Sequence, residues 1–326
     1  MERMPDFELK RAANLDEAVA WLAADPDARL LAGGTDLLPN LRRGIEPARV
    51  LIDLGAVHGL SDIALSGAGL RLGARVTLTR LAADASIVQQ VPALAEAARA
   101  VAGPGHRNAA TLAGNLCLDT RCVFYNQSEW WRASNGYCLK RGGDTCHVAP
   151  QGKRCHAAFS GDLAPVLLVL GAEVELVSAR GTRQIALAEL YRDDGAAHLT
   201  ISRDEVLAAV RLPAAGPDLR SGYRKARTRG AMDFALAGVA CALSLRDGVL
   251  GELRIAVTGT NSNPFLLSGC DEFTGCPVDA DLLTQIGKRV QKQVSPMRST
   301  VTPSNYRRLV AAVLAQRLVS ELSATA

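Results

Sequence analysis

Residues 28–37 read ARLLAGGTDL, and this stretch decides how the N-terminal part of the chain folds. The apolar run at 28–32 predicts a buried strand, and a short helix is expected to follow it through Arg43. The two glycines between them permit positive φ and close backbone approach, so consecutive N–H groups could face an anion. Thr35 or Asp36 could cap the helix. Taken alone, the stretch fits a tight structural turn as well as it fits a phosphate site.

A second loop, ATLAGN at 110–115, repeats the combination of small residues, a hydroxyl and a glycine. Two such loops could clamp a diphosphate from both sides. Asp162 could accept hydrogen bonds from ribose or ring hydroxyls, or it could be the N-cap of the segment 163–170. The pair of loops leaves a nucleotide cofactor and a structural role equally supported.

The rest of the first 56 residues predicts a small α/β unit. A helix is expected over 15–24, with Asn14 as its N-cap and Glu17 at the capping-box position, and a strand over 50–54.

Residues 63–78 alternate as two strands around Gly67-Ala-Gly69. The sequence GAGLRLG superficially matches a dinucleotide fingerprint, but its third glycine comes one residue too late and the alternation continues where a helix is required. A hairpin is therefore predicted. The pattern over 81–102 is helical.

The C-terminal half predicts further strands and two helices. Strands are expected over 173–177, 184–187 and 206–212, followed by a linker at 213–217 (PAAGP), strands around Arg224 and over 235–245 and 253–258, and helices over 279–293 and 304–323.

A polar stretch at 117–155 holds five of the eight cysteines: Cys117, Cys122, Cys138, Cys146 and Cys155. Loops of this length inside a compact domain are usually functional or disordered, and its aromatic residues argue against disorder. The spacing C-x4-C-x15-C-x7-C-x8-C matches neither paired zinc knuckles nor the run of bacterial ferredoxins. It predicts that four thiolates could converge, without identifying the metal.

Cys117 is the least suited of the five to be a ligand, because it continues the apolar segment LAGNLCL, where a small cysteine packs well. His147 and His156 each follow a cysteine and could be ligands, hydrogen-bond donors to ligands, or simply exposed. Cys241 lies in an apolar strand and is expected in the core.

Composition excludes several classes of protein. A net charge of +4 with 21% charged residues gives no nucleic-acid surface and no membrane patch. The N-terminus lacks the apolar run of a signal peptide, and no stretch reaches the roughly 18 to 20 apolar residues that span a bilayer. We expect a cytoplasmic protein, in which cysteines favour metal or redox chemistry over disulfides.

No catalytic residues are predicted in this chain, because it contains no Ser–His–Asp order, HExxH, P-loop or paired-carboxylate signature. An electron-transfer role needs no such residues, since cofactors carry the chemistry.

Four motifs, AGGTDLLPNLR, ATLAGNL, GDLAPVLLVLGAEVEL and YRKARTRGAMDFALAGVA, together resemble the FAD-binding subunits of the xanthine oxidase and carbon monoxide dehydrogenase family of molybdenum hydroxylases. The resemblance implies an α+β fold of the vanillyl-alcohol-oxidase and molybdenum-hydroxylase type. Its two FAD-binding subdomains would be residues 1–56 and 57–213, the second with an inserted iron–sulfur loop at 118–160, and a C-terminal α+β domain would follow at 217–326.

The same resemblance implies the cofactor-binding residues. These are Leu31, Ala32, Gly33, Gly34, Thr35, Asp36, Leu37, Ala110, Thr111, Gly114, Asn115, Asp162 and Lys225. A one-residue gap leaves Arg224 as an alternative to Lys225 near the flavin. Ala113 departs from the family pattern, in which many relatives have a second glycine.

The insert, with DTRCVFYNQSEWWR at 119–132, resembles the 4-hydroxybenzoyl-CoA reductase branch of this family. That resemblance implies a [4Fe–4S] cluster on Cys122, Cys138, Cys146 and Cys155. It also implies partner subunits, a large one with molybdenum and a small one with [2Fe–2S] clusters, in a dimer of heterotrimers. Ferredoxin would donate electrons for reductive dehydroxylation to benzoyl-CoA, and the excess of basic residues in the insert would suit an acidic donor.

Two alternatives remain open. The chain could be the flavin subunit of another molybdenum hydroxylase, since substrate identity lies in the large subunit. It could also be a non-enzymatic scaffold whose cysteine loop binds structural zinc.

Overall fold

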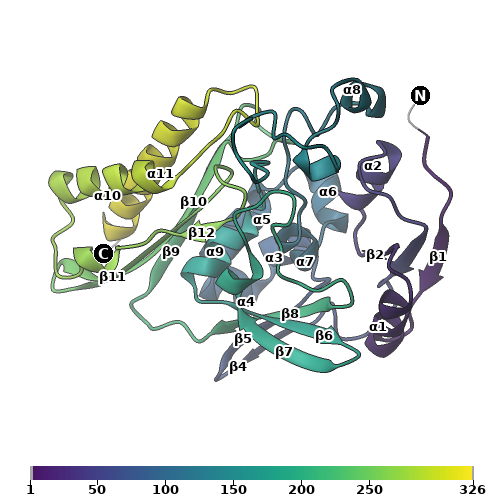
Figure 1. Ribbon diagram of the computed structural model, residues 1–326. Coiled ribbons are helices and arrows are strands. Elements are labelled where there is room, and N and C mark those ends of the chain that lie inside the picture. Colours follow the sequence, from purple (N-terminus) through teal and green to yellow (C-terminus); the bar gives the residue numbers. More distant parts are fainter. Residues whose placement is uncertain (1–2, 325–326) are drawn as a thin grey trace.

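The computed structural model describes residues 3–324, which contain three sheets with helices between and around them (Figure 1). The expected domain limits at residues 1 and 326 lie outside the described residues. Within residues 3–324, no helix is both long and apolar enough to cross a membrane.

The first unit is a three-stranded parallel sheet in the order β1–β3–β2, with two helices. Its elements are β1 (Glu8–Arg11), α1 (Leu15–Ala24), β2 (Ala28–Leu31), α2 (Leu37–Arg42) and β3 (Val50–Asp53). Asn14 caps α1 by accepting from the Glu17 N–H, as predicted. The Glu17 carboxylate accepts from Ala13, one residue before the cap. The strand β1 was not predicted, because its side chains are largely exposed and show no apolar alternation.

The second unit contains a five-stranded sheet in the order β4–β5–β8–β6–β7, in which all neighbours are antiparallel. Its strands are β4 (Ile63–Ser66), β5 (Gly69–Gly73), β6 (Glu173–Ser178), β7 (Gly181–Ala186) and β8 (Val206–Pro213). The predicted hairpin over 63–78 is confirmed, with β4 and β5 paired from Ile63–Leu72 to Ser66–Gly69.

The helical pattern over 81–102 is confirmed, but the segment is divided among three helices. They are α3 (Leu78–Ala83), α4 (Ala85–Gln90) and α5 (Pro92–Ala100). Asp84 ends α3 and caps α4, with its carboxylate accepting from the N–H groups of Ser86 and Ile87. Pro92 lacks an N–H and therefore begins α5 instead of continuing α4.

Four more helices and two 3₁₀ turns complete this unit. They are α6 (Pro104–Ala109), α7 (Leu112–Leu116), α8 (Glu129–Ser134), η1 (Leu139–Arg141), α9 (Leu163–Val169) and η2 (Leu187–Leu190). Every residue of α9 is buried, which explains why its sequence shows a continuous apolar run and no helical periodicity.

The C-terminal unit is a four-stranded antiparallel sheet in the order β12–β11–β10–β9. Its elements are β9 (Arg220–Ala226), β10 (Ala237–Arg246), β11 (Val249–Thr258), β12 (Phe265–Leu266), η3 (Asp271–Phe273), α10 (Ala280–Gln293) and α11 (Ser304–Ala324). The strands and helices expected here are confirmed in type and approximate position.

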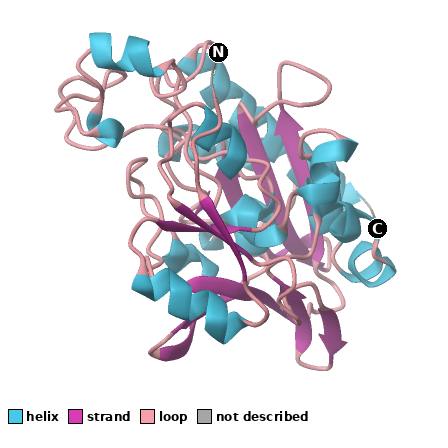
Figure 2. Ribbon diagram, turned by 90° about the vertical axis from the view of Figure 1, so that its right-hand side faces the viewer, coloured by secondary structure: helices cyan, strands magenta, loops and turns pink. Residues whose placement is uncertain are grey.

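Alternate residues of β10 face two different cores. Val239 and Cys241 pack with α10 and α11, whereas Ala240 and Ala242 belong to the core that contains α5 and α9. Cys241 is fully buried, as predicted. The sheet is thus covered on both faces, and Figure 2 shows helices flanking its strands. This packing fixes the C-terminal unit against the helices that border the candidate site.

Candidate functional site

The two glycine loops meet in space. A Cβ built on Gly33 would overlap the carbonyl oxygen of Ala109 and lie 2.6 Å from its carbonyl carbon, so only glycine fits there. Gly34 adopts φ +68°, a conformation that side chains rarely tolerate. The backbone of the first loop therefore lies directly on the residue that precedes the second loop.

Local hydrogen bonds fix the second loop. Thr111 caps α7, with its hydroxyl accepting from the Gly114 N–H at 3.2 Å. The Leu112 N–H donates to Val76 at 2.9 Å, which ties the loop to the end of the β4–β5 hairpin. The buried side chain of Asn115 accepts from the Leu163 N–H at 3.0 Å and thereby holds the N-terminus of α9.

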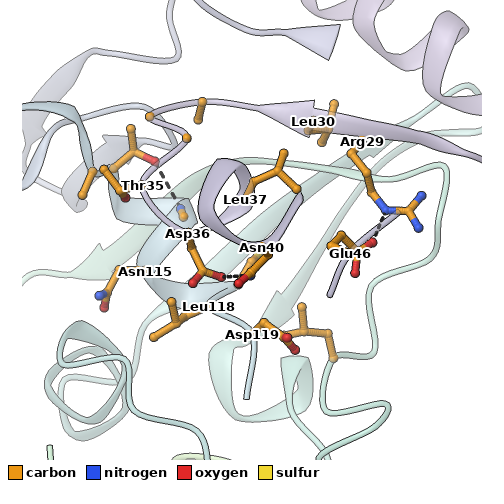
Figure 3. Close-up of a pocket in the computed structure, with 18 of the residues that line it drawn as sticks. Arg29, Leu30, Thr35, Asp36, Leu37, Asn40, Glu46, Asn115, Leu118 and Asp119 are labelled. Atoms are coloured by element: carbon orange, nitrogen blue, oxygen red, sulfur yellow. Dashed lines mark hydrogen bonds and ion pairs between the residues drawn. The ribbon is translucent and has the colours of Figure 1, made fainter. Parts of the chain in front are cut away.

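A cavity of about 830 Å³ opens along both loops. Figure 3 shows Thr35, Asp36 and Asn40 on one wall with Asn115, Leu118 and Asp119 nearby. Of the residues predicted to bind the cofactor, those on its walls are Ala32, Gly33, Gly34, Thr35, Asp36, Leu37, Ala110, Thr111, Gly114, Asn115, Asp162 and Lys225. Leu31 is the exception, because it packs beneath the loop against the small core around Leu41 and Leu51.

Asp162 and Lys225 form a buried ion pair on the cavity wall, with Nζ 2.9 Å from Oδ2 and both side chains 4% exposed. The Tyr223 hydroxyl donates to the other carboxylate oxygen at 2.6 Å. Burial and the adjacent Asp162 raise the pKa of Tyr223, so it stays a donor. Asp162 stands at the N-cap position of α9 but makes no side-chain cap bond there.

Arg224 and Lys225 have different surroundings in the structure. Lys225 lines the cavity and also donates to the Ala100 carbonyl at 3.2 Å. The guanidinium of Arg224 lies against Glu96 and Glu321 instead. Successive strand residues point to opposite faces, so only one of the two can face the cavity.

Asp36 does not cap α2 with its side chain. Its carboxylate pairs with Arg121, which directly precedes Cys122, and accepts from Asn40 at 3.2 Å. Burial raises the pKa of Asp36, while Arg121 opposes that effect. The first glycine loop is therefore bonded to the cysteine-rich stretch.

The cysteine-rich stretch is ordered by buried cations and turns. Arg132, only 2% exposed, donates to the carbonyls of Tyr125, Gln127 and Gly44 and pairs with Glu129. Gly44 follows the end of α2, so its bond with Arg132 holds α8, which carries Arg132, beside α2 (Figure 1).

Of the four cysteines predicted as ligands, Cys122, Cys146 and Cys155 are buried and Cys138 is partly exposed. Burial raises the pKa of Cys122; the N–H groups of Phe124 and Tyr125 lower it, and Cys146 and Cys138 raise it. Burial likewise raises the pKa of Cys155 to about 12, with smaller effects from Ala157, Lys140, Cys146 and Cys138. Cys138 and Cys146 thus lie near enough to Cys122 and to Cys155 to raise the pKa of each.

Cys117 stands apart from this group. Burial alone raises the pKa of its thiol to about 12, and no other cysteine contributes. It packs against the main core and lines the cavity. His147, one of the possible ligands, has its Nε2 2.7 Å from the Tyr137 carbonyl and its ring stacked on Phe124.

Among residues 3–324, no three His, Cys, Asp or Glu side chains converge closely enough to hold one metal ion. A closed tetrahedral zinc site needs four such ligands around one ion, with each sulfur about 2.3 Å from it, and the described residues show no such convergence.

Several cavity residues were not predicted. His198 is 7% exposed, and its Nε2 lies 3.0 Å from the Leu118 carbonyl. Burial lowers the pKa of His198 to about 4. Asp119 also lines the cavity. His198 carries no local sequence signal, because it reaches the cavity through a contact that spans 80 residues.

The two loops, the cavity and the buried ion pair define a protein that holds an extended nucleotide cofactor between α/β units. Cavities of about 300 to 1,000 Å³ commonly hold such ligands, and the glycine backbone leaves room for a diphosphate.

Two family models cover almost the whole chain. Residues 5–215 match the FAD binding domain in molybdopterin dehydrogenase, and residues 221–322 match the CO dehydrogenase flavoprotein C-terminal domain. The chain belongs to this FAD-binding family of the molybdenum hydroxylases, and FAD is its cofactor.

Curated relatives agree with this assignment. The chain is 34% identical to the aldehyde oxidoreductase FAD-binding subunit of Escherichia coli K12, with 82% of this chain and 86% of the relative covered. It is 29% identical to the xanthine dehydrogenase FAD-binding subunit of Escherichia coli O157:H7, with 97% and 96% covered.

Solved structures support the fold. A chain of the Cu,Mo-CO dehydrogenase superposes with a TM-score of 0.82 at 23% identity, covering 99% of this chain and 100% of that one. The predicted α+β fold, an FAD-binding part followed by a C-terminal domain, is confirmed.

Proposed function

We propose that this chain is the FAD and [4Fe–4S] electron-transfer subunit of a 4-hydroxybenzoyl-CoA reductase. The observation that carries the proposal is the group of Cys122, Cys138, Cys146 and Cys155, whose stretch begins on the wall of the flavin cavity at Cys117. A cubane cluster takes one thiolate on each of four irons, so its ligands stand farther apart than those of a single ion.

The donor set fits such a cluster. Cys138 and Cys146 raise the pKa of both Cys122 and Cys155. The Ala157 N–H donates to the Cys155 sulfur at 3.4 Å, and the N–H groups of Phe124 and Tyr125 lower the pKa of Cys122. Hydrogen bonds of this kind stabilise thiolate charge and tune cluster potentials. When bound, the cluster and FAD would supply electron carriers between a low-potential ferredoxin and the partner subunits.

The chain's own residues have defined tasks in this proposal. The glycine loops would bind the FAD diphosphate, and Lys225, fixed by Asp162, would present a positive charge to the flavin end of the cavity. Arg121 joins the two sites by pairing with Asp36 from the position before Cys122.

The partners follow from the relatives, which are named as FAD-binding subunits and medium chains of larger enzymes. We propose a molybdenum-containing large subunit and a [2Fe–2S] small subunit, in a cytoplasmic dimer of heterotrimers. The large subunit would bind 4-hydroxybenzoyl-CoA and use the electrons to replace its phenolic hydroxyl with hydrogen, releasing benzoyl-CoA and water.

A second candidate is the flavin subunit of another molybdenum hydroxylase. The names of the relatives favour it, because they cover xanthine, aldehyde and carbon monoxide enzymes. Assays of the purified complex with 4-hydroxybenzoyl-CoA and reduced ferredoxin, against xanthine and aldehydes with dyes, separate the two candidates.

The deciding experiment combines metal analysis with two cysteine variants. Iron, sulfide and zinc assays with a visible spectrum distinguish a cluster from the zinc scaffold. Cys138→Ser should lose iron and ferredoxin-driven turnover, while dye-driven reduction of the flavin persists. The matched control Cys117→Ser should keep both. If Cys138→Ser abolished both reactions with FAD content intact, the cluster would not be the entry point for electrons.

A further inference from the structure

Lys140 is a buried cation with a fixed position. Its side chain is 6% exposed, and its Nζ lies 2.6 Å from Asp119 Oδ1 and 3.0 Å from the Thr120 carbonyl. A further hydrogen bond goes to the Thr120 hydroxyl. An ammonium has three N–H donors, and here each has an acceptor. Lys140 is therefore held at one point, unlike an exposed lysine.

This point lies between the two candidate redox sites. On one side, Asp119 lines the flavin cavity. On the other side, the ammonium lies 4.6 Å from the centre of the Tyr125 ring. Tyr125 packs in the same small core as Cys122 and Cys155.

The charge balance at this point is informative. Burying an ammonium is costly unless negative charge compensates it. Asp119 supplies one carboxylate, but that side chain is 27% exposed, so water screens part of its charge. Thiolates bound to iron would add negative charge on the Tyr125 side, where the described contacts of Lys140 include no second carboxylate.

We propose that Lys140 is an electrostatic tuning residue that raises the reduction potential of the iron–sulfur group held by Cys122, Cys138, Cys146 and Cys155. The inference rests on the proposed cluster. Reduction by a one-electron donor of the ferredoxin class adds one negative charge to the group and needs no proton. A fixed positive charge nearby favours the reduced form, because net charge is among the factors that set such potentials.

The test is a redox titration of the purified complex, followed through the cluster's visible and EPR signals, with iron, sulfide and FAD content measured in parallel. Lys140→Met keeps the chain length and removes the charge. At a fixed solution potential, its ratio of reduced to oxidised cluster should fall about tenfold, which corresponds to about 59 mV for a one-electron couple. Lys140→Arg keeps the charge and should stay within about threefold of the parent.

Asp119→Asn supplies a change of opposite sign with almost no change in shape. It leaves the ammonium with less compensating charge, so the reduced fraction should rise. This variant decides the question if Lys140→Met loses its cluster.

The outcomes separate the two proposals. A parent complex whose iron and sulfide do not exceed those of its [2Fe–2S] clusters, and which shows no [4Fe–4S] EPR signal on reduction, overturns the proposed cluster and this role with it. If the parent complex contains the cluster, the role of Lys140 alone is overturned when Lys140→Met keeps its iron and its ratio of reduced to oxidised cluster stays within about twofold of the parent's. That role is also overturned if Asp119→Asn fails to raise the reduced fraction.

Discussion

Replacing Gly33 with alanine should weaken FAD binding, because the two glycine loops touch at this residue. The added methyl would overlap the Ala109 carbonyl oxygen and lie 2.6 Å from its carbonyl carbon. Carbon atoms make favourable contacts at about 3.5 to 4.0 Å. The two backbones would therefore have to separate by about 1 Å, and neither atom belongs to a flexible side chain that could move aside.

The expected magnitude follows from that displacement. Overpacking a well-packed site costs about 1 to 3 kcal/mol. Because the separation opens the loops that line the cavity, we expect most of this cost to appear in FAD binding. At about 1.4 kcal/mol per factor of ten, the dissociation constant should rise by about 5- to 150-fold.

The assay is titration of the FAD-depleted protein with FAD, followed by quenching of flavin fluorescence. Gly105→Ala is the matched control, because no atom lies within 4 Å of a Cβ at that position and the residue is close to the second loop. Thermal unfolding of both apo variants shows whether either change acts on the fold as a whole.

Two results would refute the reasoning. One is an FAD affinity of Gly33→Ala within about twofold of the parent. The other is an equal loss in Gly105→Ala, which would mean that the contact with Ala109 is not the cause.

Two further predictions concern buried titratable groups. Asp162→Ala leaves Lys225 without its carboxylate and should lower the free energy of unfolding by about 3 to 5 kcal/mol in urea titrations; a double variant that adds Lys225→Met should be more stable than the single one, and an equal or lower stability would contradict the pairing. His198, whose pKa is lowered to about 4 by burial, takes up a proton on unfolding between that value and its ordinary pKa of about 6.5. Its stabilising contribution is complete above about pH 6.5 and is lost as pH falls toward 4. Unfolding midpoints of His198→Gln should therefore depend less on pH in this window than those of the parent.

Local patterns predicted most elements of this fold, and the misses have physical causes. Strand β10 is visible in the sequence as a continuous apolar run, because each face of the strand meets a different core. By contrast, β1 (Glu8–Arg11) is an edge strand that pairs, within residues 3–324, with β3 alone. Pairing between distant segments leaves no pattern in exposed side chains. The segment 81–102 keeps its helical composition across breaks, which depend on the cap at Asp84 and on Pro92.

The candidate site likewise combines features that the sequence predicts with contacts that it does not predict. Glycine loops are visible in sequence because positive φ and close approach restrict residue type locally. Partners across long separations are not visible. Asp162 bonds Tyr223 and Lys225 from 61 and 63 residues away, and no property of Asp162 itself indicates which hydroxyl or ammonium it meets.

The cysteine-rich stretch is held in place by contacts of the same long range. By sequence it is an insertion, yet its contacts reach all three units of the fold. Arg121 binds Asp36 of the first unit, the Val123 N–H donates to the Ser299 carbonyl of the third, and the Cys155 carbonyl accepts from both Gly195 and Ser262.

These contacts anchor the insertion to the units that form the cavity. Its four candidate ligands are therefore fixed relative to the flavin loops by the same bonds that fold it. In the proposed function, this anchoring would keep the cluster and the flavin at one separation. It also explains why buried Arg132 and Lys140, which stabilise an otherwise loop-rich segment, lie around the cysteines rather than on the protein surface.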